Sequence, residues 1–452
     1  MSMLQLFKPK AAIIYSLVLA LTAGWFTLPS QADALNSSIY VDAVNGSDST
    51  GDGTEAKPYS SIRRASIVTE PGDTVYVKNG TYYETSGQAV VEIKRSGTPG
   101  YPITYKAYPG HNPVLRTQNA WNHIIINGAS HIIIEGLEIY GYNQTITQAE
   151  AQARKDHFLA NRAGGTVNWT YMAQTNTNGI SIKNDTTTNS YPHHIIIRNN
   201  KVHDVPGGGI YTDRADYITI ENNTVYNNAW WSIYANSGIS IFHPYDTDNN
   251  TTTYKNIIQR NNAYNNESRL IWYVTNDYSD GNGIIVDDTK NKQIGAAAYK
   301  GKTLVTNNVS SSNGGSGIHA YSSENVDIIN NTAYHNGRII NDGNIYANSS
   351  NNVKILNNIM VARNSTSKVN SNYNNTNLTY DYNIHYGGIV AIQGSHDLNT
   401  DPKFVNPSGG NFKLNADSPA IDSGTSTLAP SVDYTGKARP AGAGYDRGAY
   451  EY

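Results

Sequence analysis

The phrase NGISIK (Asn178–Lys183) recurs along this chain. Each copy begins with a pair of residues that contains glycine, and an isoleucine and a short alternating stretch follow the pair. Its further copies are GGIYTD (208–213), SGISIF (237–242), NGIIVD (282–287), SGIHAY (316–321) and a weaker GNIYAN (343–348). An internal repeat of this size is typical of a solenoid. Because the alternation is that of strands, with Gly and Asn at the turns, the sequence predicts an all-β solenoid and not a helical one.

One isoleucine of each copy marks the period: Ile180, Ile210, Ile239, Ile284, Ile318 and Ile345. The spacings are 30, 29, 45, 34 and 27 residues. The shortest spacing suits one coil of three short strands and three turns, and the longer ones require inserted loops. We therefore predict a single-stranded right-handed parallel β-helix, with these isoleucines stacked in one inward file.

A second element, an apolar-alternating stretch closed by Asn-Asn, lies between the copies. HHIIIRNN ends at Asn200 and DYITIENN ends at Asn223, and TLVTNN, VDIINN and VKILNN follow. Asn tolerates the left-handed turn conformation, and its amide can bond to the Asn of the next coil. We interpret these pairs as a structural ladder in the turns.

Polar residues gather on the outward side of the copies, because successive side chains of a strand point to opposite faces. Stacked coils bring matching positions to about 4.8 Å from one another. This polar stripe consists of Lys183, Tyr211, Asp213, Arg214, His243, Asp287, Asp288, His319 and Tyr321. We predict that it forms the functional site, with the two tyrosines contacting the substrate and the other residues in catalytic roles.

The first residues are typical of a secretory leader. Two lysines precede the apolar run AAIIYSLVLALTAGWFTL, and Ala32-Asp33-Ala34 fits a small-x-small cleavage site. We expect residues 1–34 to be removed and residues 35–452 to form one secreted, extracellular catalytic domain. No later stretch is long and apolar enough to span a membrane.

Composition narrows the classes of partner. The 452 residues carry a formal charge of −3 without any basic block, which argues against a nucleic-acid partner. There are no cysteines, which excludes disulfides and thiolate metal sites. The 34 tyrosines suit strands, and those on the surface suit a carbohydrate partner. We expect a monomer.

Departures from the repeat surround the stripe. The stretch 146–162 is strongly helical and opens an insert over 146–178, and two further inserts cover 243–254 and 267–281. Loops on a rigid scaffold often carry function, so we expect the helical insert to overhang the stripe. A short amphipathic helix is predicted over 60–69. Residues from about 400 to 452 abandon the repeat and are expected to cap the open end of the solenoid.

Several phrases carry a resemblance to known proteins. YVDAVNGSDS, PGDTVYVKNGTY, SGTPGYPITYKAYPG, the NN-terminated coils and the closing DRGAYEY resemble secreted bacterial right-handed parallel β-helix proteins. Many of these are polysaccharide lyases that act on pectate, alginate or other uronate polymers, and others are glycoside hydrolases. The GFKLGG-type and Asp-Asp-Gly-Trp motifs of one pectate-lyase branch are absent from this sequence. The polygalacturonase-like pattern matches in part, since Asp287-Asp288 precede His319 by one coil.

Elimination fits the polar stripe best. A lyase removes the C5 proton of a uronate and breaks the C4–O bond, which requires a base and a neutralised carboxylate. Lys183, Arg214, His243 and His319 are the candidate bases and neutralisers. Asp213, Asp287 and Asp288 are candidate ligands for Ca²⁺, which prefers carboxylate oxygens. Tyr211 or Tyr321 could protonate the leaving oxygen.

Two other functions stay open. A hydrolase of an acidic polysaccharide would use Asp213, Asp287 and Asp288 as its acid and base. A glycan-binding solenoid without catalytic activity would use the stripe for recognition alone. The residues do not indicate which uronate polymer is cleaved or whether cleavage is endo or exo.

Overall fold

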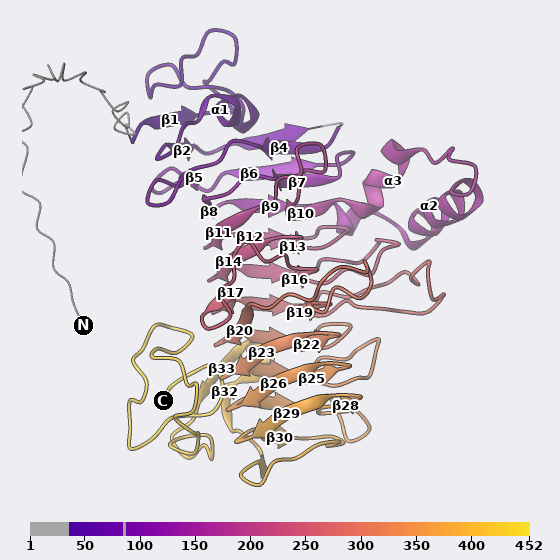
Figure 1. Cartoon of the computed structure of the whole chain (residues 1–452), viewed down its shortest axis with the longest axis vertical. Helices are drawn as coiled ribbons and strands as arrows, with labels where there is room; N and C mark the ends of the chain where they lie inside the picture. The colour runs from indigo at the N-terminus through magenta and orange to yellow at the C-terminus, as the bar shows by residue number, and fades with distance from the viewer. Residues whose placement is uncertain (1–35, 85–86) are drawn as a thin grey trace, which may run out of the picture. The chain divides into compact units, whose positions relative to one another are not determined.

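The computed structural model describes residues 36–84 and 87–452, so the predicted leader over 1–34 lies outside the described part. Three long parallel sheets run along the described part of the chain, and each complete coil contributes one strand to each sheet (Figure 1). Strand β10 (Asn178–Lys183), for example, leads to β11 (His193–Arg198) and β12 (Lys201–His203) before the chain returns to the first sheet. The predicted parallel β-helix is confirmed.

The sheet that carries the repeated phrases is called sheet C here. It contains β4 (Ala89–Ile93), β7 (Asn122–Asn127), β10 (Asn178–Lys183), β13 (Ile210–Asp213), β16 (Ile239–Phe242), β19 (Ile284–Asp287), β22 (Ile318–Tyr321), β25 (Ile345–Asn348) and β28 (Asn372–Tyr373).

The sheet that follows sheet C within each coil is called sheet A. It contains β1 (Ser38–Val41), β2 (Thr74–Val77), β5 (Ile103–Ala107), β8 (Ile132–Glu135), β11 (His193–Arg198), β14 (Asp216–Glu221), β17 (Tyr254–Gln259), β20 (Lys302–Thr306), β23 (Glu324–Ile329), β26 (Asn351–Leu356) and β29 (Thr376–Asp381).

The third sheet is called sheet B. It contains β3 (Thr81–Glu84), β6 (Val114–Thr117), β9 (Glu138–Tyr140), β12 (Lys201–His203), β15 (Thr224–Tyr226), β18 (Asn262–Tyr264), β21 (Val309–Ser311), β24 (Thr332–Tyr334), β27 (Ile359–Val361), β30 (Ile384–Tyr386) and β31 (Leu398–Asn399). An antiparallel pair, β32 (Phe404–Asn406) and β33 (Asn411–Leu414), follows.

The core is a stack of inward files, as the alternation predicts. Ile180 pairs with Ile210 in the next coil, and the file continues through Ile239, Ile284 and Ile318. All of these side chains are fully buried. The file persists across long insertions because a loop changes the chain length between coils but leaves the register of the strands intact.

The Asn-Asn pairs build the predicted ladder. The first Asn of each pair adopts a left-handed conformation, with φ from 53° to 58° at Asn199, Asn222, Asn307, Asn330 and Asn357. The second Asn is buried, and its backbone and side-chain amides both donate to the side-chain oxygen of the next rung. The rungs are Asn200, Asn223, Asn261, Asn308, Asn331, Asn358 and Asn383. Before Asn261 and Asn383 the left-handed position is held by Arg260 and Tyr382 in place of an asparagine.

A second ladder was not predicted. It joins Asn228, Asn266, Asn313, Asn336 and Asn344 through the same pair of donors. Only Asn228 and Asn266 of its members close an Asn-Asn pair, so the sequence signal for this ladder is weaker. The two ladders satisfy buried polar groups at two corners of the coils.

Replacing Asn308 with alanine should lower the free energy of unfolding by about 2–4 kcal/mol, because it leaves several buried partners unsatisfied. Asn308 donates to the backbone oxygens of Ile258 and Thr306 and accepts from Asn261. The matched control is Asn222→Gly, which keeps a left-handed turn and should stay within about 1 kcal/mol of the parent. Urea unfolding of both variants measures the difference. Equal losses of unfolding free energy in the two variants would show that the hydrogen bonds of the ladder contribute nothing to stability beyond the turn conformation.

Three helices, α1 (Ile62–Val68), α2 (Gln148–Asn161) and α3 (Trp169–Asn176), depart from the strand pattern. The first confirms the helix predicted over 60–69, with the Ser61 side chain as its N-cap. The second confirms the helical insert, and Thr147 and Glu150 form its capping box. The third was not predicted as a separate helix. None of these described helices is long and apolar enough to cross a membrane.

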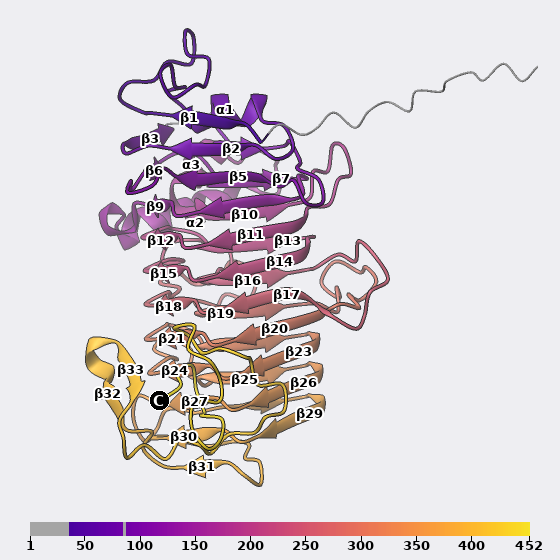
Figure 2. The same cartoon turned by 90° about the vertical axis from the view of Figure 1, so that its left-hand side faces the viewer.

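We expected the C-terminal segment to lie across the open end of the solenoid. It lies instead along the side of the last coils (Figure 2). Phe404, Phe412 and Leu414 pack on outward residues of sheet B, among them Ile359 and Ile384. Loop residues Val390 and Ile392 pack instead against the end of the core. The segment follows the side because sheet B presents apolar side chains outward in these coils.

Candidate active site

Two outward files of sheet C form the floor of a groove. One file runs through Ser181, Tyr211, Ser240, Ile285, His319 and Tyr346. The other runs through Lys183, Asp213, Phe242, Asp287, Tyr321 and Asn348. The groove encloses about 680 Å³, which lies within the range of small-molecule and cofactor sites.

Aromatic side chains from outside the strands form the walls. The wall residues are Trp121, Tyr234, Trp272, Tyr273 and Tyr278. Several of them pack in one apolar cluster with Phe158 of α2 and Met172 of α3. Figure 1 shows these two helices projecting from the stack at the level of β10 and β13. The helical insert thus supports the wall, and only its last part, at Asn176, lines the groove itself.

Five residues of the polar stripe line the groove: Lys183, Tyr211, Asp287, His319 and Tyr321. Lys183 and Asp287 occupy the same file three strands apart, roughly 14 Å between Cα atoms at the usual strand spacing. Lys183 is the only lysine or arginine among the lining residues that the structure describes. The groove therefore offers one lysine near one end and the Asp287 carboxyl group farther along the same file.

Asp288 and His243 of the stripe turn away from the groove. Asp288 has no exposed surface, and its carboxylate accepts from the backbone of Lys292 and Gln293 and from the Ser322 hydroxyl. His243 is buried between Asp288, at 3.2 Å, and Asp213, at 3.6 Å. We therefore correct the expectation that His243 and Asp288 face the substrate: they brace the turn after the strand, and Asp213 is occupied by its contact with His243.

Arg214 also points elsewhere, which corrects its expected role as a base or neutraliser. Its guanidinium lies over the rings of Tyr191 and Tyr245, 5.4 and 5.7 Å from their centres. Arg214, His243 and Asp288 all have positive φ, at 61°, 43° and 49°. This left-handed step rotates the side chain out of the strand's alternation, which is why reading one residue beyond the phrase misplaced them.

Two carboxyl groups of the groove have raised pKa values. Burial, the neighbouring charge of Asp280 and that of Asp288 hold the pKa of Asp287 well above its usual range. Burial likewise raises the pKa of Asp280, although Ser237, Ser279 and Asn282 donate hydrogen bonds to it. The pair is thus poised to hold a proton or to share a cation.

Burial keeps two other polar groups of the floor, Tyr211 and His319, neutral. Burial raises the pKa of the Tyr211 phenol well above its usual value, and Asp213 and Asp287 add to the shift. Burial lowers the pKa of His319 to about 3, and its ring stacks on Tyr346 with centres 4.2 Å apart. His319 is therefore uncharged at neutral pH and does not neutralise a substrate carboxylate, contrary to one of its two expected roles.

Sequence reasoning missed Asp280 and the aromatic wall. Asp280 belongs to the insert over 267–281, one of the departures from the repeat that flank the stripe, but no motif indicates which of its residues turns inward. The wall residues Trp121 and Tyr234 lie in connections without any repeat signal. Only the folding of separate loops over the same coils brings these side chains together.

The predicted metal ligands do not form one set. Asp287 faces the groove, whereas Asp288 is engaged by the turn and Asp213 faces His243. Asp280 is the carboxyl group that the structure places near Asp287. A calcium role for this protein stays a prediction.

A parallel β-helix with an aromatic-walled groove on one sheet is the class that this fold and site define. A family model described as "Pel9A-like, right handed beta helix region" matches residues 39–352, and the chain belongs to this family. The crystal structure of pectate lyase Pel9A is similar, with a TM-score of 0.54 and 17% identity over 92% of this chain and 98% of that one. At that identity the likeness shows the fold alone.

Two curated relatives match over short regions. The uncharacterized protein YwoF of Bacillus subtilis (strain 168) is 34% identical over 119 residues, 25% of this chain and 24% of its own length. Pectate lyase PEL9 of Emericella nidulans is 36% identical over 81 residues, 18% of each chain. The chain thus spans a quarter or less of the length of these relatives.

Proposed function

We propose that this protein is a secreted polysaccharide lyase that cleaves a uronate-containing polymer by β-elimination in the groove of sheet C. The observation that carries the proposal is that Lys183 and a protonated Tyr211, which come from adjacent strands, both line one aromatic-walled groove. Aromatic walls with a few convergent polar groups suit a sugar chain. The family and the name of its pectate lyase member support this class of reaction.

The reaction assigns one role to each of these two groups. In its neutral amine form Lys183 accepts the C5 proton of the uronate, and the electrons of that bond form the C4–C5 double bond as the C4–O bond breaks. Tyr211 donates its proton to the departing oxygen, which becomes the hydroxyl of the new chain end. Tyr211 can fill this role because its raised pKa keeps the phenol protonated.

The substrate carboxylate must be neutralised before C5–H becomes acidic. The groove has a single lysine but three carboxyl groups among its lining residues, Asp280, Asp287 and Asp342. A Ca²⁺ ion held by Asp280 and Asp287 would relieve their repulsion and supply the positive charge for the carboxylate. Chelator treatment should then abolish cleavage, and added Ca²⁺ should restore it.

The Asp280–Asp287 pair also favours a second candidate, a glycoside hydrolase. Two carboxyl groups whose pKa values rise together can share one proton and act as general acid and base. In this candidate Asp280 and Asp287 act as the acid and base, whereas the sequence predicted them among Asp213, Asp287 and Asp288. Asp213 and Asp288 do not line the groove.

A panel of uronate polymers separates the two candidates. Ultraviolet absorbance reports the unsaturated product of a lyase, and a reducing-end assay reports any cleavage. We expect both signals to rise together on at least one of pectate, alginate or a glucuronate polymer. The carboxyl-reduced form of that polymer should not be cleaved, because its C5–H is no longer acidic. Reducing ends without absorbance, on either form, would overturn elimination in favour of hydrolysis.

A further inference from the structure

Three histidines meet at a corner of the coils away from the groove. His131 immediately precedes β8, and His193 and His194 begin β11, the neighbouring strand of sheet A. None of the three lines the groove. They come from successive coils, so the cluster exists only because the parallel register brings these coils together.

The three rings present nitrogen atoms to a common point. One ligand atom from each lies within 4.8 Å of the other two. Nδ1 of His193 is 2.8 Å from Nδ1 of His194, and the His131 and His194 ring centres are 4.8 Å apart. Burial lowers the pKa of His131 to about 4, and that of the other two is lowered as well, so the rings are neutral. Neutral imidazole is the form that ligates metal ions.

The turn itself does not require histidine. His131 and His194 both have φ of 55°, and Asn325, Asn352 and Asn377 adopt φ of 50° to 57° as the second residues of β23, β26 and β29 in later coils of sheet A. Asn adopts this conformation more readily than most residues other than glycine. Histidine at the earlier positions therefore adds ligand atoms that the backbone geometry alone does not need.

We propose that His131, His193 and His194 bind a borderline divalent transition-metal ion, with Zn²⁺ as the leading candidate. Imidazole is a preferred ligand of Zn²⁺, Co²⁺, Ni²⁺ and Cu²⁺, whereas Ca²⁺ takes oxygen ligands. The ion would join the coil of β8 to the coil that carries Lys183, since β10 and β11 belong to the same coil. It would stabilise the part of the solenoid that holds the proposed base.

The test uses the full secreted chain without a histidine tag, freed of metal by a chelator and then dialysed. Co²⁺ is titrated in the presence of excess Ca²⁺, which occupies carboxylate sites, and visible absorbance reports imidazole ligation. Calorimetry with Zn²⁺ gives the stoichiometry. We expect one ion per chain and a melting temperature that rises by several degrees on saturation.

The variants His131→Asn and His194→Asn keep a residue that tolerates positive φ, so both should fold. Each should weaken Co²⁺ and Zn²⁺ binding by roughly 100-fold or more. The control is His396→Gln, which removes an exposed histidine that pairs with Asp381 in a distant coil. Absence of binding by the parent chain, or unchanged affinity in both asparagine variants, would overturn the site. Loss of polymer cleavage does not enter this test, so it is independent of the lyase proposal.

Discussion

Replacing Lys183 with alanine should lower kcat/KM on the cleaved uronate polymer by ~10²–10⁴-fold, the usual contribution of a general base. Thermal stability should stay close to that of the parent, because the Lys183 side chain is part-exposed on the groove floor and takes no part in the core. Initial rates of absorbance increase, together with a melting curve, measure both quantities.

The Lys183→Arg variant separates two roles for this residue. Arginine keeps the positive charge but stays protonated, so it cannot accept the C5 proton. If Lys183 is the base, the arginine variant should be as inactive as the alanine variant. Recovery of most activity by arginine would reassign Lys183 to holding the substrate carboxylate.

The matched control for both variants is Lys413→Ala, which removes an exposed lysine of β33, far from the groove residues in the fold. It should leave kcat/KM unchanged. Full turnover by Lys183→Ala would exclude Lys183 from the chemistry and move the search for the base to His319, the other nitrogen base that lines the groove.

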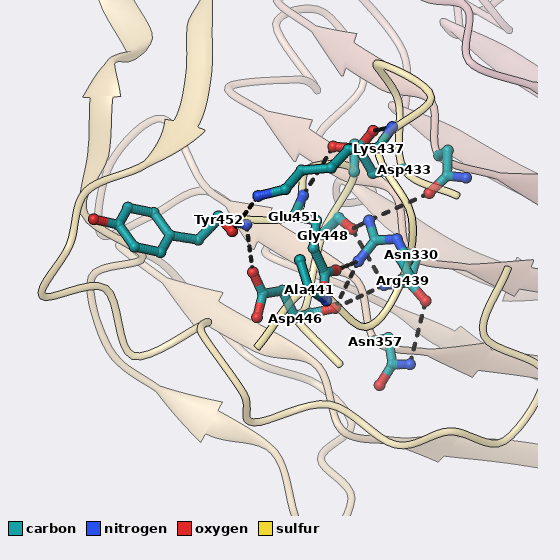
Figure 3. A network of polar contacts seen from close by, with 12 residues as sticks. Asn330, Asn357, Asp433, Lys437, Arg439, Ala441, Asp446, Gly448, Glu451 and Tyr452 are labelled. Atoms are coloured by element: carbon teal, nitrogen blue, oxygen red, sulfur yellow. Dashed lines mark hydrogen bonds and ion pairs between the residues drawn. The ribbon is translucent and has the colours of Figure 1, made fainter. Parts of the chain in front are cut away.

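Replacing Glu451 with alanine should lower the free energy of unfolding by about 3–5 kcal/mol, the usual cost of leaving one partner of a buried ion pair alone. Figure 3 shows the network, in which Arg439 pairs with Glu451 and neither side chain is exposed. Arg439 also donates to the backbone oxygens of Asp446 and Gly448. Without Glu451 the guanidinium stays buried and loses its counter-charge.

The same network joins the C-terminal segment to the coils. The Asn330 side chain donates to the backbone oxygens of Asp446 and Gly448, and Glu451 accepts from the Ala441 backbone. Loss of the ion pair should therefore loosen the segment from sheet B as well as lower the overall stability. Chemical denaturation followed by two probes, circular dichroism and proteolysis of the segment, detects both effects.

Two controls define the origin of the loss. The double variant Arg439→Met with Glu451→Leu removes both charges and should recover stability to within about 1–2 kcal/mol of the parent. The variant Lys403→Ala breaks an exposed ion pair with Asp417 and should change stability by less than about 1 kcal/mol. Equal losses from Glu451→Ala and Lys403→Ala would show that burial of the pair is energetically irrelevant.

The sequence by itself determined the solenoid. Alternation within NGISIK and its copies decides which side chains face inward, and this is a property of each short strand alone. The file from Ile180 to Ile318 and the Asn200 ladder follow directly, since equivalent positions in stacked coils must become neighbours. The same reasoning placed Lys183, Asp287 and His319 on one outward face.

Tertiary structure decided which outward residues belong to the groove. A left-handed step after the strand turns Arg214, His243 and Asp288 away, and the sequence pattern carries no sign of that rotation. Asp280 and the aromatic wall enter from loops whose direction depends on packing against α2 and α3. The C-terminal segment likewise follows the apolar outer face of sheet B, a surface that exists only after the coils have stacked. Local alternation therefore fixes the scaffold, whereas contacts between distant loops complete the site.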